Sequence, residues 1–336
     1  MGDPVVSDFR LLRGFEEAWR PPVRLQRPET VLGAGGGAAA RARLARLVRR
    51  APEVMVKVTG RTRDAGHLRA HLEYITRRGL LEAEGPDGVV SGRDEVQETA
   101  QAWADATEME PRRWAGAPLS LSLVLSMPAG TDALRLHAAA RAFAQEAFGD
   151  ERDWLMALHT DADHPHVHLT VCALGWDGRR LNPRKADLEA WRQGFARALR
   201  DHGIEAEATP RRARGVARKA ERGAVRRMRE RWAAGQGAAP RVLASALREA
   251  ASGGVEEGPW AAARRRRAVV QGLYAAQALA LARAADPADR ALGAQLAAFA
   301  AAMPEPETRR ERLARALRRT VDRDALGGGP DRSRGR

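Results

Sequence analysis

The spacing of apolar residues between positions 54 and 203 predicts alternating strands and helices. Runs of alternating or β-branched apolar residues predict strands at 54–58, 119–126, 154–159 and 166–174. Apolar residues at helical spacing predict helices at 66–79, about 94–107, 132–148 and 185–203. Turn residues occupy 85–88 and 175–178. This order predicts an α+β fold in which helices pack on a mainly antiparallel sheet.

The segments on either side lack this alternation. Residues 1–50 are rich in Arg, Pro and Gly, which predicts a mobile basic arm. Residues 211–336 are rich in Ala and Arg, with helical spacing at 269–284 and 309–319. We therefore expect three parts: the arm, a folded domain over 51–210, and an extended or loosely packed basic helical tail whose role the sequence does not indicate.

Charge is distributed unevenly along the chain. The formal net charge of +14 and the pI of about 11.2 favour a polyanionic partner. The tail has 28 Lys and Arg against 13 Asp and Glu, whereas 51–210 has 19 against 25. Within the tail, 211–231 holds ten basic and two acidic residues. Such a run is often only a solvated helix face, but this excess favours salt-sensitive contact with nucleic acid.

Two absences bear on the compartment. The single cysteine, Cys172, excludes an internal disulfide bond and fits a reducing environment. The sequence has no stretch apolar enough to cross a membrane, and its start lacks the pattern of a secretory signal. We therefore expect a cytoplasmic protein without membrane insertion.

Four of the eight histidines lie in HTDADHPHVH, residues 159–168. Because side chains alternate along a strand, His166 and His168 point to one face. His159 ends the preceding strand, and a short connection can fold it back as a third metal ligand; His164, in the turn, is the alternative. Three neutral imidazoles leave coordination positions open for substrate, which is typical of a catalytic metal site.

Two further side chains fit reaction chemistry. Asp161 is near enough in sequence to accept the spare N–H of an imidazole, or to take up a proton. Tyr74 shares a helix face with His67 and His71, beside the apolar stripe, so a packed core tyrosine is the alternative to a nucleophile. The two histidines are expected to be solvated or to contact phosphates, with a second metal site as the alternative. The other tyrosine, Tyr274, is expected to pack between helices.

Three blocks of sequence, taken in order, resemble the relaxases of conjugation and plasmid mobilization, which are HUH endonucleases of the MobA and T-DNA border type. HLEYITRRG (71–79) resembles the nucleophile motif, LSLVLSMPAGT (121–131) the second motif, and HTDADHPHVHLTV (159–171) the metal motif. The resemblance covers roughly residues 54–205. It departs at the start of the second block, where the family often has a histidine and this chain has Ser120 and Leu121.

The resemblance implies a site- and strand-specific endonuclease and transesterase for single-stranded DNA, which nicks and rejoins a plasmid transfer origin. Tyr74 would form a 5′-phosphotyrosine and free a 3′-hydroxyl, helped by one divalent cation on His159, His166 and His168. The family implies Mg²⁺ or Mn²⁺, although three nitrogen ligands alone would suit Zn²⁺ or Mn²⁺. It also implies accessory origin-binding proteins and a coupling protein of a secretion system as partners.

Basic and aromatic residues near the motifs are expected to hold the DNA. Arg77 and Arg78 follow the tyrosine, and four more basic residues follow the metal strand: Arg179, Arg180, Arg184 and Lys185. Trp176 lies in the turn between them and is expected to stack on a base. The alternative is a hydrophobic plug over the sheet edge.

Three other functions are compatible with parts of this pattern. In replication initiators and transposases of the HUH type, the tyrosine commonly follows the histidine motif, whereas Tyr74 precedes it. A catalytically silent nucleic-acid-binding protein would keep the fold without using the tyrosine or the histidines. A hydrolytic metallonuclease that activates water would not need Tyr74.

Overall fold

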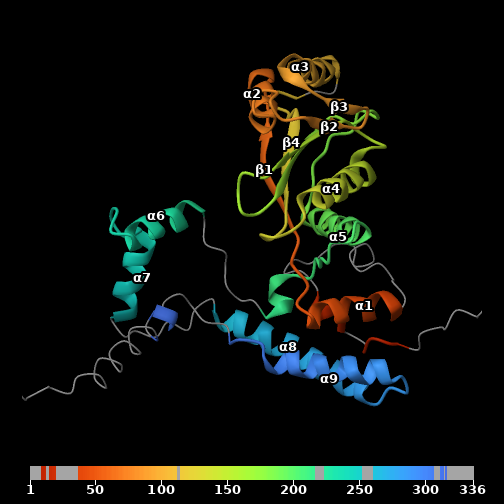
Figure 1. Cartoon of the computed structure of the whole chain (residues 1–336), viewed down its shortest axis with the longest axis vertical. Helices are drawn as coiled ribbons and strands as arrows, with labels where there is room; N and C mark the ends of the chain where they lie inside the picture. The colour runs from red at the N-terminus through yellow and green to blue at the C-terminus, as the bar shows by residue number, and fades with distance from the viewer. Residues whose placement is uncertain are drawn as a thin grey trace, which may run out of the picture. The chain divides into compact units, whose positions relative to one another are not determined.

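The computed structural model describes residues 9–12, 15–19, 37–111, 114–215, 223–251, 260–305, 311–313 and 315. They belong to two compact units, labelled by element in Figure 1. Unit 1 comprises the described residues within Met1–Glu16 and Arg20–Thr209, and unit 2 comprises Glu17–Trp19 and those from Pro210 onward. A short 3₁₀ helix, η1 (Phe15–Ala18), spans the first boundary between them.

The centre of unit 1 is a six-stranded sheet in the order β1-β4-β6-β5-β2-β3, with every neighbouring pair antiparallel. Its strands are β1 (Met55–Thr62), β2 (Ala83–Gly85), β3 (Gly88–Val90), β4 (Ser120–Ser126), β5 (Trp154–His159) and β6 (His166–Cys172). With helices packed on this sheet, the predicted α+β fold is confirmed.

One face of the sheet is apolar and packs against α4 (Ala133–Phe148) and α5 (Lys185–Asp201). Alternation along β4 and β6 turns Leu123 and Leu169 into this core, where Phe143 and Phe195 meet at 5.7 Å between ring centroids. This large buried cluster holds β4 and β6 rigidly, which fixes the side chains on their other face.

The opposite face is only partly covered, by α2 (Ala65–Ile75) and α3 (Gly92–Met109). Leu68, Leu72 and Ile75 of α2 are fully buried and belong to a second core with Trp103 of α3. Polar side chains of β4 and β6 occupy the rest of this face. The sheet therefore has an apolar face on one side, and on the other a polar surface next to α2 and the second core.

The observed elements differ from the predicted ones at several points; β1, for example, extends to Thr62 rather than ending at 58. The strands β2 and β3 were not predicted, because three-residue strands give no periodic signal, although the turn between them was. The second helix ends at Ile75, since Arg77, Arg78 and Gly79 have φ angles of 51°, 60° and 81°. Strand β6 ends at Cys172 rather than at 174.

The largest difference lies in the expected mobile arm. Residues Gly37–Val48 form a helix, α1, in which Leu44 and Leu47 are buried. The Arg46 guanidinium donates to Glu207 at 2.8 Å, and that of Arg43 donates to Thr209 at 3.1 Å. These partners are 161 and 166 residues away in the sequence, so the local pattern of residues could not reveal them and predicted an arm instead. Residues 1–8, 13–14 and 20–36 of that prediction lie outside the described residues.

Unit 2 is helical where it is described. Its elements are η3 (Arg211–Arg214), α6 (Gly223–Ala233), α7 (Arg241–Ala251), α8 (Trp260–Ala282) and α9 (Pro287–Ala301). The predicted packing of Tyr274 is confirmed: it is buried on α8, its hydroxyl donates to the Ala213 carbonyl at 2.8 Å, and its ring meets Phe299 edge-on. The predicted helical patch at 309–319 lies mostly outside the described residues.

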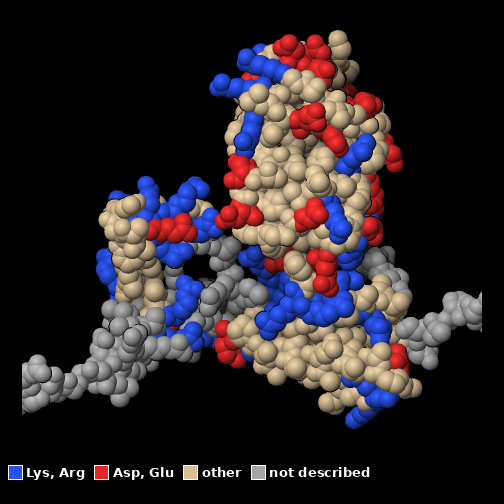
Figure 2. All heavy atoms as spheres, viewed as in Figure 1, with Lys and Arg blue, Asp and Glu red and all other residues tan. Residues whose placement is uncertain are grey.

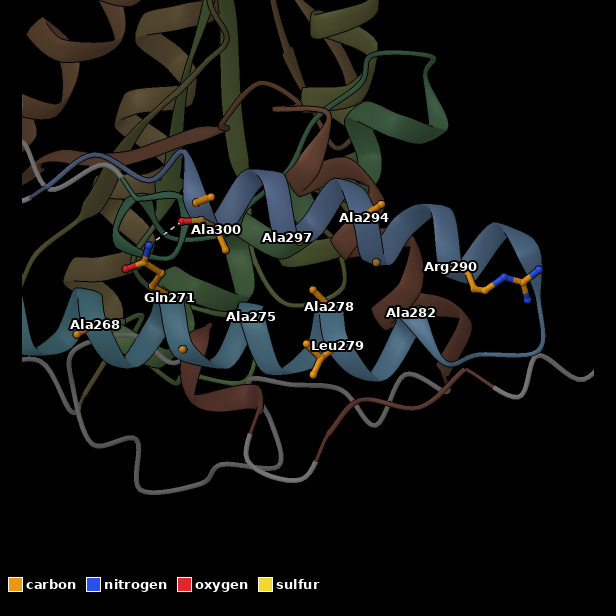
Figure 3. A pocket seen from close by; sticks show the side chains of 13 residues that line it. Ala268, Gln271, Ala275, Ala278, Leu279, Ala282, Arg290, Ala294, Ala297 and Ala300 are labelled. Carbon is orange, nitrogen blue, oxygen red and sulfur yellow. Dashed lines mark hydrogen bonds between the residues drawn. The ribbon is translucent and has the colours of Figure 1, made fainter.

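Two surfaces of unit 2 stand out. A cavity of about 820 Å³ lies along α8 and α9, lined mainly by alanines, with Gln271 bonded to the Ala300 carbonyl at one end (Figure 3). No residue of α6 is buried, so its arginines face solvent (Figure 2). None of the helices that the structure describes, in either unit, is both long and apolar enough to cross a membrane.

Candidate active site

Three histidines meet on the polar face of the sheet. His159 and His166 face each other across β5 and β6, and His168 follows His166 on the same side of β6. One ring nitrogen from each lies within 4.8 Å of the others, the one such His, Cys, Asp or Glu group among the described residues. The structure therefore gathers His159, rather than the alternative His164, with the other two.

Backbone carbonyls fix the tautomers of two of these rings. Nε2 of His159 donates to the Ile75 carbonyl at 2.7 Å, and Nδ1 of His166 donates to the His164 carbonyl at 3.1 Å. Because a carbonyl only accepts, the free lone pairs are on Nδ1 of His159 and Nε2 of His166. Such a second hydrogen bond is usual for metal-binding histidines. Asp161 was expected to fill this role, but its carboxylate lies 3.9 Å from Nδ1 of His159.

The third ring is held neutral. Burial, together with the neighbouring His159 and His166, lowers the pKa of His168 to about 4. Histidine binds a metal only when it is deprotonated, so a ring that stays neutral at physiological pH is ready to bind. The three side chains, henceforth the histidine triad, thus match the donor chemistry of one divalent cation with positions left open.

Tyr74 lies beside the triad, although 85 positions separate it from His159. It is the penultimate residue of α2, its side chain is 66% exposed, and its ring meets that of His168 edge-on at 6.1 Å between centroids. A cavity of about 350 Å³ joins them, lined by Glu73, Tyr74, Arg77, Arg78, His159 and Asp161. Tyr74 is therefore not a packed core tyrosine, and its hydroxyl can be reached from solvent.

The chain takes an unusual path directly after this tyrosine. Arg77, Arg78 and Gly79 are all left-handed, a conformation that costs side-chain-bearing residues roughly 1–2 kcal/mol each. At Gly79 a Cβ would lie 2.4 Å from the backbone nitrogen of Arg93, so only glycine fits there. This turn directs Arg77 to Asp161, with 2.8 Å between nitrogen and oxygen.

The Arg77–Asp161 pair changes the expected role of the carboxylate. A hydrogen bond from its own backbone N–H lowers the pKa of Asp161, and the charge of Arg77 lowers it further. The carboxylate is thus ionised and engaged at neutral pH. Asp161 can still accept a proton, but it is a weaker base than a free carboxylate.

The other predicted DNA contacts do not meet the triad. They follow the opposite end of β6, which is six residues, or about 20 Å, from His166 at the usual strand rise. Trp176 is 62% exposed and its indole N–H donates to Asp153, so it is an anchored ring on the surface and not a buried plug. Arg179 pairs with Asp177 at 3.4 Å. Arg184 caps α5 and Lys185 begins it.

Trp114, which lies at this end, was not predicted from the sequence. The guanidinium of Arg180 lies 5.1 Å from the ring centroid of Trp114, which is exposed, and also donates to the Pro118 carbonyl. Stacked arginine and tryptophan are frequent at sites for single-stranded nucleic acid. No sequence signal connects positions 66 residues apart, so only the fold reveals the pair.

Near the triad, the environment of His71 differs from the prediction, and Lys57 was not predicted at all. His71 is half-buried and bonded to the sheet, whereas His67 is exposed as expected. Lys57 is exposed on β1 and pairs with Val124, which pairs with His168, so it is two strands, or about 10 Å, from the triad on the same face. Strand alternation alone could not reveal this, because it needed the order of the strands.

Comparison with known proteins identifies the same region. Residues 74–204 match the family model "Relaxase: MobA/VirD2-like, nuclease domain". The T-DNA border endonuclease VirD2 of Rhizobium rhizogenes is 30% identical over 183 residues, 49% of this chain and 42% of the relative. VirD2 of Agrobacterium fabrum (41% of the relative) and of Rhizobium radiobacter (43%) are equally identical. The chain therefore spans less than half the length of these relatives, and the resemblance seen in the sequence is confirmed for this region.

Proposed function

We propose that this chain, whose residues 74–204 match the MobA/VirD2-like relaxase nuclease domain, is a site- and strand-specific nicking-closing enzyme for single-stranded DNA at a plasmid transfer origin. The observation that carries the proposal is the exposed Tyr74 ring set against His168 of the histidine triad. An exposed tyrosine beside a metal-binding set and two arginines has the parts needed for phosphoryl transfer.

The reaction is a transesterification. The Tyr74 oxygen gives up its proton and attacks the scissile phosphorus, forming a 5′-phosphotyrosine bond. The bond from phosphorus to the 3′-oxygen breaks, its electron pair stays on that oxygen, and the oxygen takes a proton to become a 3′-hydroxyl. One phosphodiester replaces another, so the reverse reaction rejoins the strand. Asp161 keeps its predicted role as an acceptor for the tyrosine proton, directly or through water.

His159, His166 and His168 would hold one divalent cation, which when bound offsets negative charge on the phosphoryl oxygens. The neutral His168 and the two carbonyl-fixed tautomers support this assignment. We propose Mg²⁺ or Mn²⁺, as in the family, with Mn²⁺ the better match to nitrogen ligands and Zn²⁺ the alternative.

The DNA would be held by charges on both sides of the site. Arg77 and Arg78 line the cavity with Tyr74, and we assign them to the scissile and adjacent phosphates. Lys57 would contact a phosphate farther along the strand. Trp176 and Arg180 would bind bases and backbone beyond the other end of β6.

The remaining predictions follow from the relaxase assignment. Residues 51–210 would act as the nuclease domain in the cytoplasm, and the basic helices of 211–336 would add salt-sensitive affinity for DNA. Accessory origin-binding proteins and a coupling protein of a secretion system would be the protein partners.

A covalent-adduct assay tests the proposal. The full chain is mixed with labelled single-stranded oligonucleotides tiled across the DNA flanking its gene, with Mn²⁺ or with EDTA, and analysed on a denaturing gel. We expect a shifted protein–DNA band that requires the metal and disappears in Tyr74→Phe. Cleavage that survives Tyr74→Phe without an adduct would contradict the transesterase and indicate a hydrolytic nuclease; binding without any cleavage would indicate a silent binder.

A further inference from the structure

One side of α2 carries a line of polar residues, His67, His71 and Tyr74, at helical spacing beside the buried apolar stripe. Of the three, His71 is the one that reaches into the sheet. Its Nε2 lies 2.8 Å from the Ser122 hydroxyl and 3.1 Å from the Thr170 hydroxyl. Burial lowers the pKa of His71, and the charge of His67 lowers it further, which favours a neutral ring that is hydrogen-bonded to both hydroxyls through Nε2.

The two hydroxyls converge on this nitrogen from different strands. Ser122 and Thr170 face each other across β4 and β6, and both are buried, at 4% and 0% exposure. The buried contacts of Leu68 and Leu72 hold α2 by apolar packing, which has no directional preference. Hydrogen bonds do have one, so the group Ser122–His71–Thr170, henceforth the clasp, defines how α2 is turned and how far it slides over the sheet.

The clasp is connected to both halves of the site. Thr170 is two residues after His168 on the same face of β6, so the clasp and the triad share one strand. His71 is one helical turn before Tyr74, so the clasp and the nucleophile share one helix. We propose that His71 is a positioning residue, which through the clasp sets the Tyr74 oxygen in line with a phosphate held at the triad. This inference rests on the proposed function, and in it His71 touches neither DNA nor metal.

The test uses the full chain and a cleavable origin oligonucleotide with Mn²⁺. His71→Ala is expected to lower kcat by about 10- to 100-fold, the loss that a displacement of about 1 Å produces, while KM stays within about threefold. His71→Gln, whose terminal amide can form hydrogen bonds near the position of Nε2, is expected to recover most of kcat. The matched control is His67→Ala, an exposed histidine one turn earlier on the same side, which is expected to match the wild type.

A second set of variants approaches the clasp from the sheet. Ser122→Ala combined with Thr170→Val is expected to lower kcat as His71→Ala does, and the triple variant is expected to be no worse, because all remove one interaction. Melting temperature and Mn²⁺ affinity, measured on each variant, are expected to show that the fold and the triad remain intact.

Three results would overturn the inference. One is a His71→Ala enzyme as fast as a wild type that forms the Tyr74 adduct. Another is a His71→Gln enzyme no faster than His71→Ala. The third is recovery of His71→Ala on an oligonucleotide with sulfur in place of the 3′-bridging oxygen, since this better leaving group bypasses proton delivery but not misalignment of the nucleophile. Failure of the proposed function gives a separate result: wild type and Tyr74→Phe then cleave alike.

Discussion

The two ends of strand β6 carry surfaces of different kinds. At its start, His166 and His168 are half-buried beside His159. A backbone carbonyl fixes the tautomer of His166, and the surroundings of His168 lower its pKa. Beyond its end, Trp176 and Arg179 are exposed on a turn, and an acidic residue pairs with each. About 20 Å of strand separates the two ends.

This difference indicates a division of work. Groups that act on a reacting atom must be held in one geometry, and the packed end provides that. Groups that bind a flexible polymer need reach and exposure, which the turn provides. Substitutions at the start of β6 should therefore change the rate of cleavage, and those beyond its end should change the affinity for DNA.

The largest effect is expected at the triad. His168→Ala, or EDTA with the wild type, should lower adduct formation by about 1000-fold or more, because the phosphate then loses its cation. Calorimetric titration with Mn²⁺ should show the same variant losing the metal. The matched control is His164→Ala, which removes an exposed ring outside the triad but keeps the carbonyl that His166 bonds. Loss of metal in His164→Ala but not in His168→Ala would contradict the proposed ligand set.

A smaller effect is expected at the Arg77–Asp161 pair. Arg77→Ala should slow single-turnover adduct formation by about 10- to 100-fold, since it removes one charge from the developing phosphoryl oxygens. Because both partners are about half exposed, the melting temperature should hardly change, consistent with a surface pair worth at most about 1 kcal/mol. Arg77→Lys should recover part of the rate. An unchanged rate in Arg77→Ala would remove this residue from the site.

The smallest effect on cleavage is expected beyond the end of β6. Trp176→Ala should weaken binding of a long oligonucleotide by about 5- to 30-fold, as for the loss of one stacked base, and leave the rate at saturation unchanged. Fluorescence anisotropy measures the affinity, and Trp176→Phe, which keeps a ring that can stack on a base, is the control. A lower cleavage rate of Trp176→Ala at saturating oligonucleotide would contradict the assignment of binding to this end and catalysis to the other.

Much of this arrangement could be predicted from local pattern. The expected helix at 185–203 is α5, which ends at Asp201, and the expected strand at 154–159 has those bounds. His166 and His168 could be placed on one face because alternation along a strand is rigid geometry. A short connection was enough to bring His159 opposite His166.

The rest depended on which helix lies over which strand. The Ile75 carbonyl meets His159 across 84 residues, and His71 meets Ser122 across 51, so no window of sequence contains either pair. The same limit applies to the basic residues after β6. They are near the triad in sequence, but the length of β6 carries them to the other end of the sheet.

The hydrogen bond from His159 to the Ile75 carbonyl has a consequence for when the site forms during folding. It joins the strand that carries a proposed metal ligand to the helix that carries the proposed nucleophile, so the proposed site is complete only when the two have docked. Contacts between distant segments form late in folding. If the chain has the proposed activity, a newly made or partly unfolded molecule would not cut DNA, and the ability to cut would arise together with the finished fold.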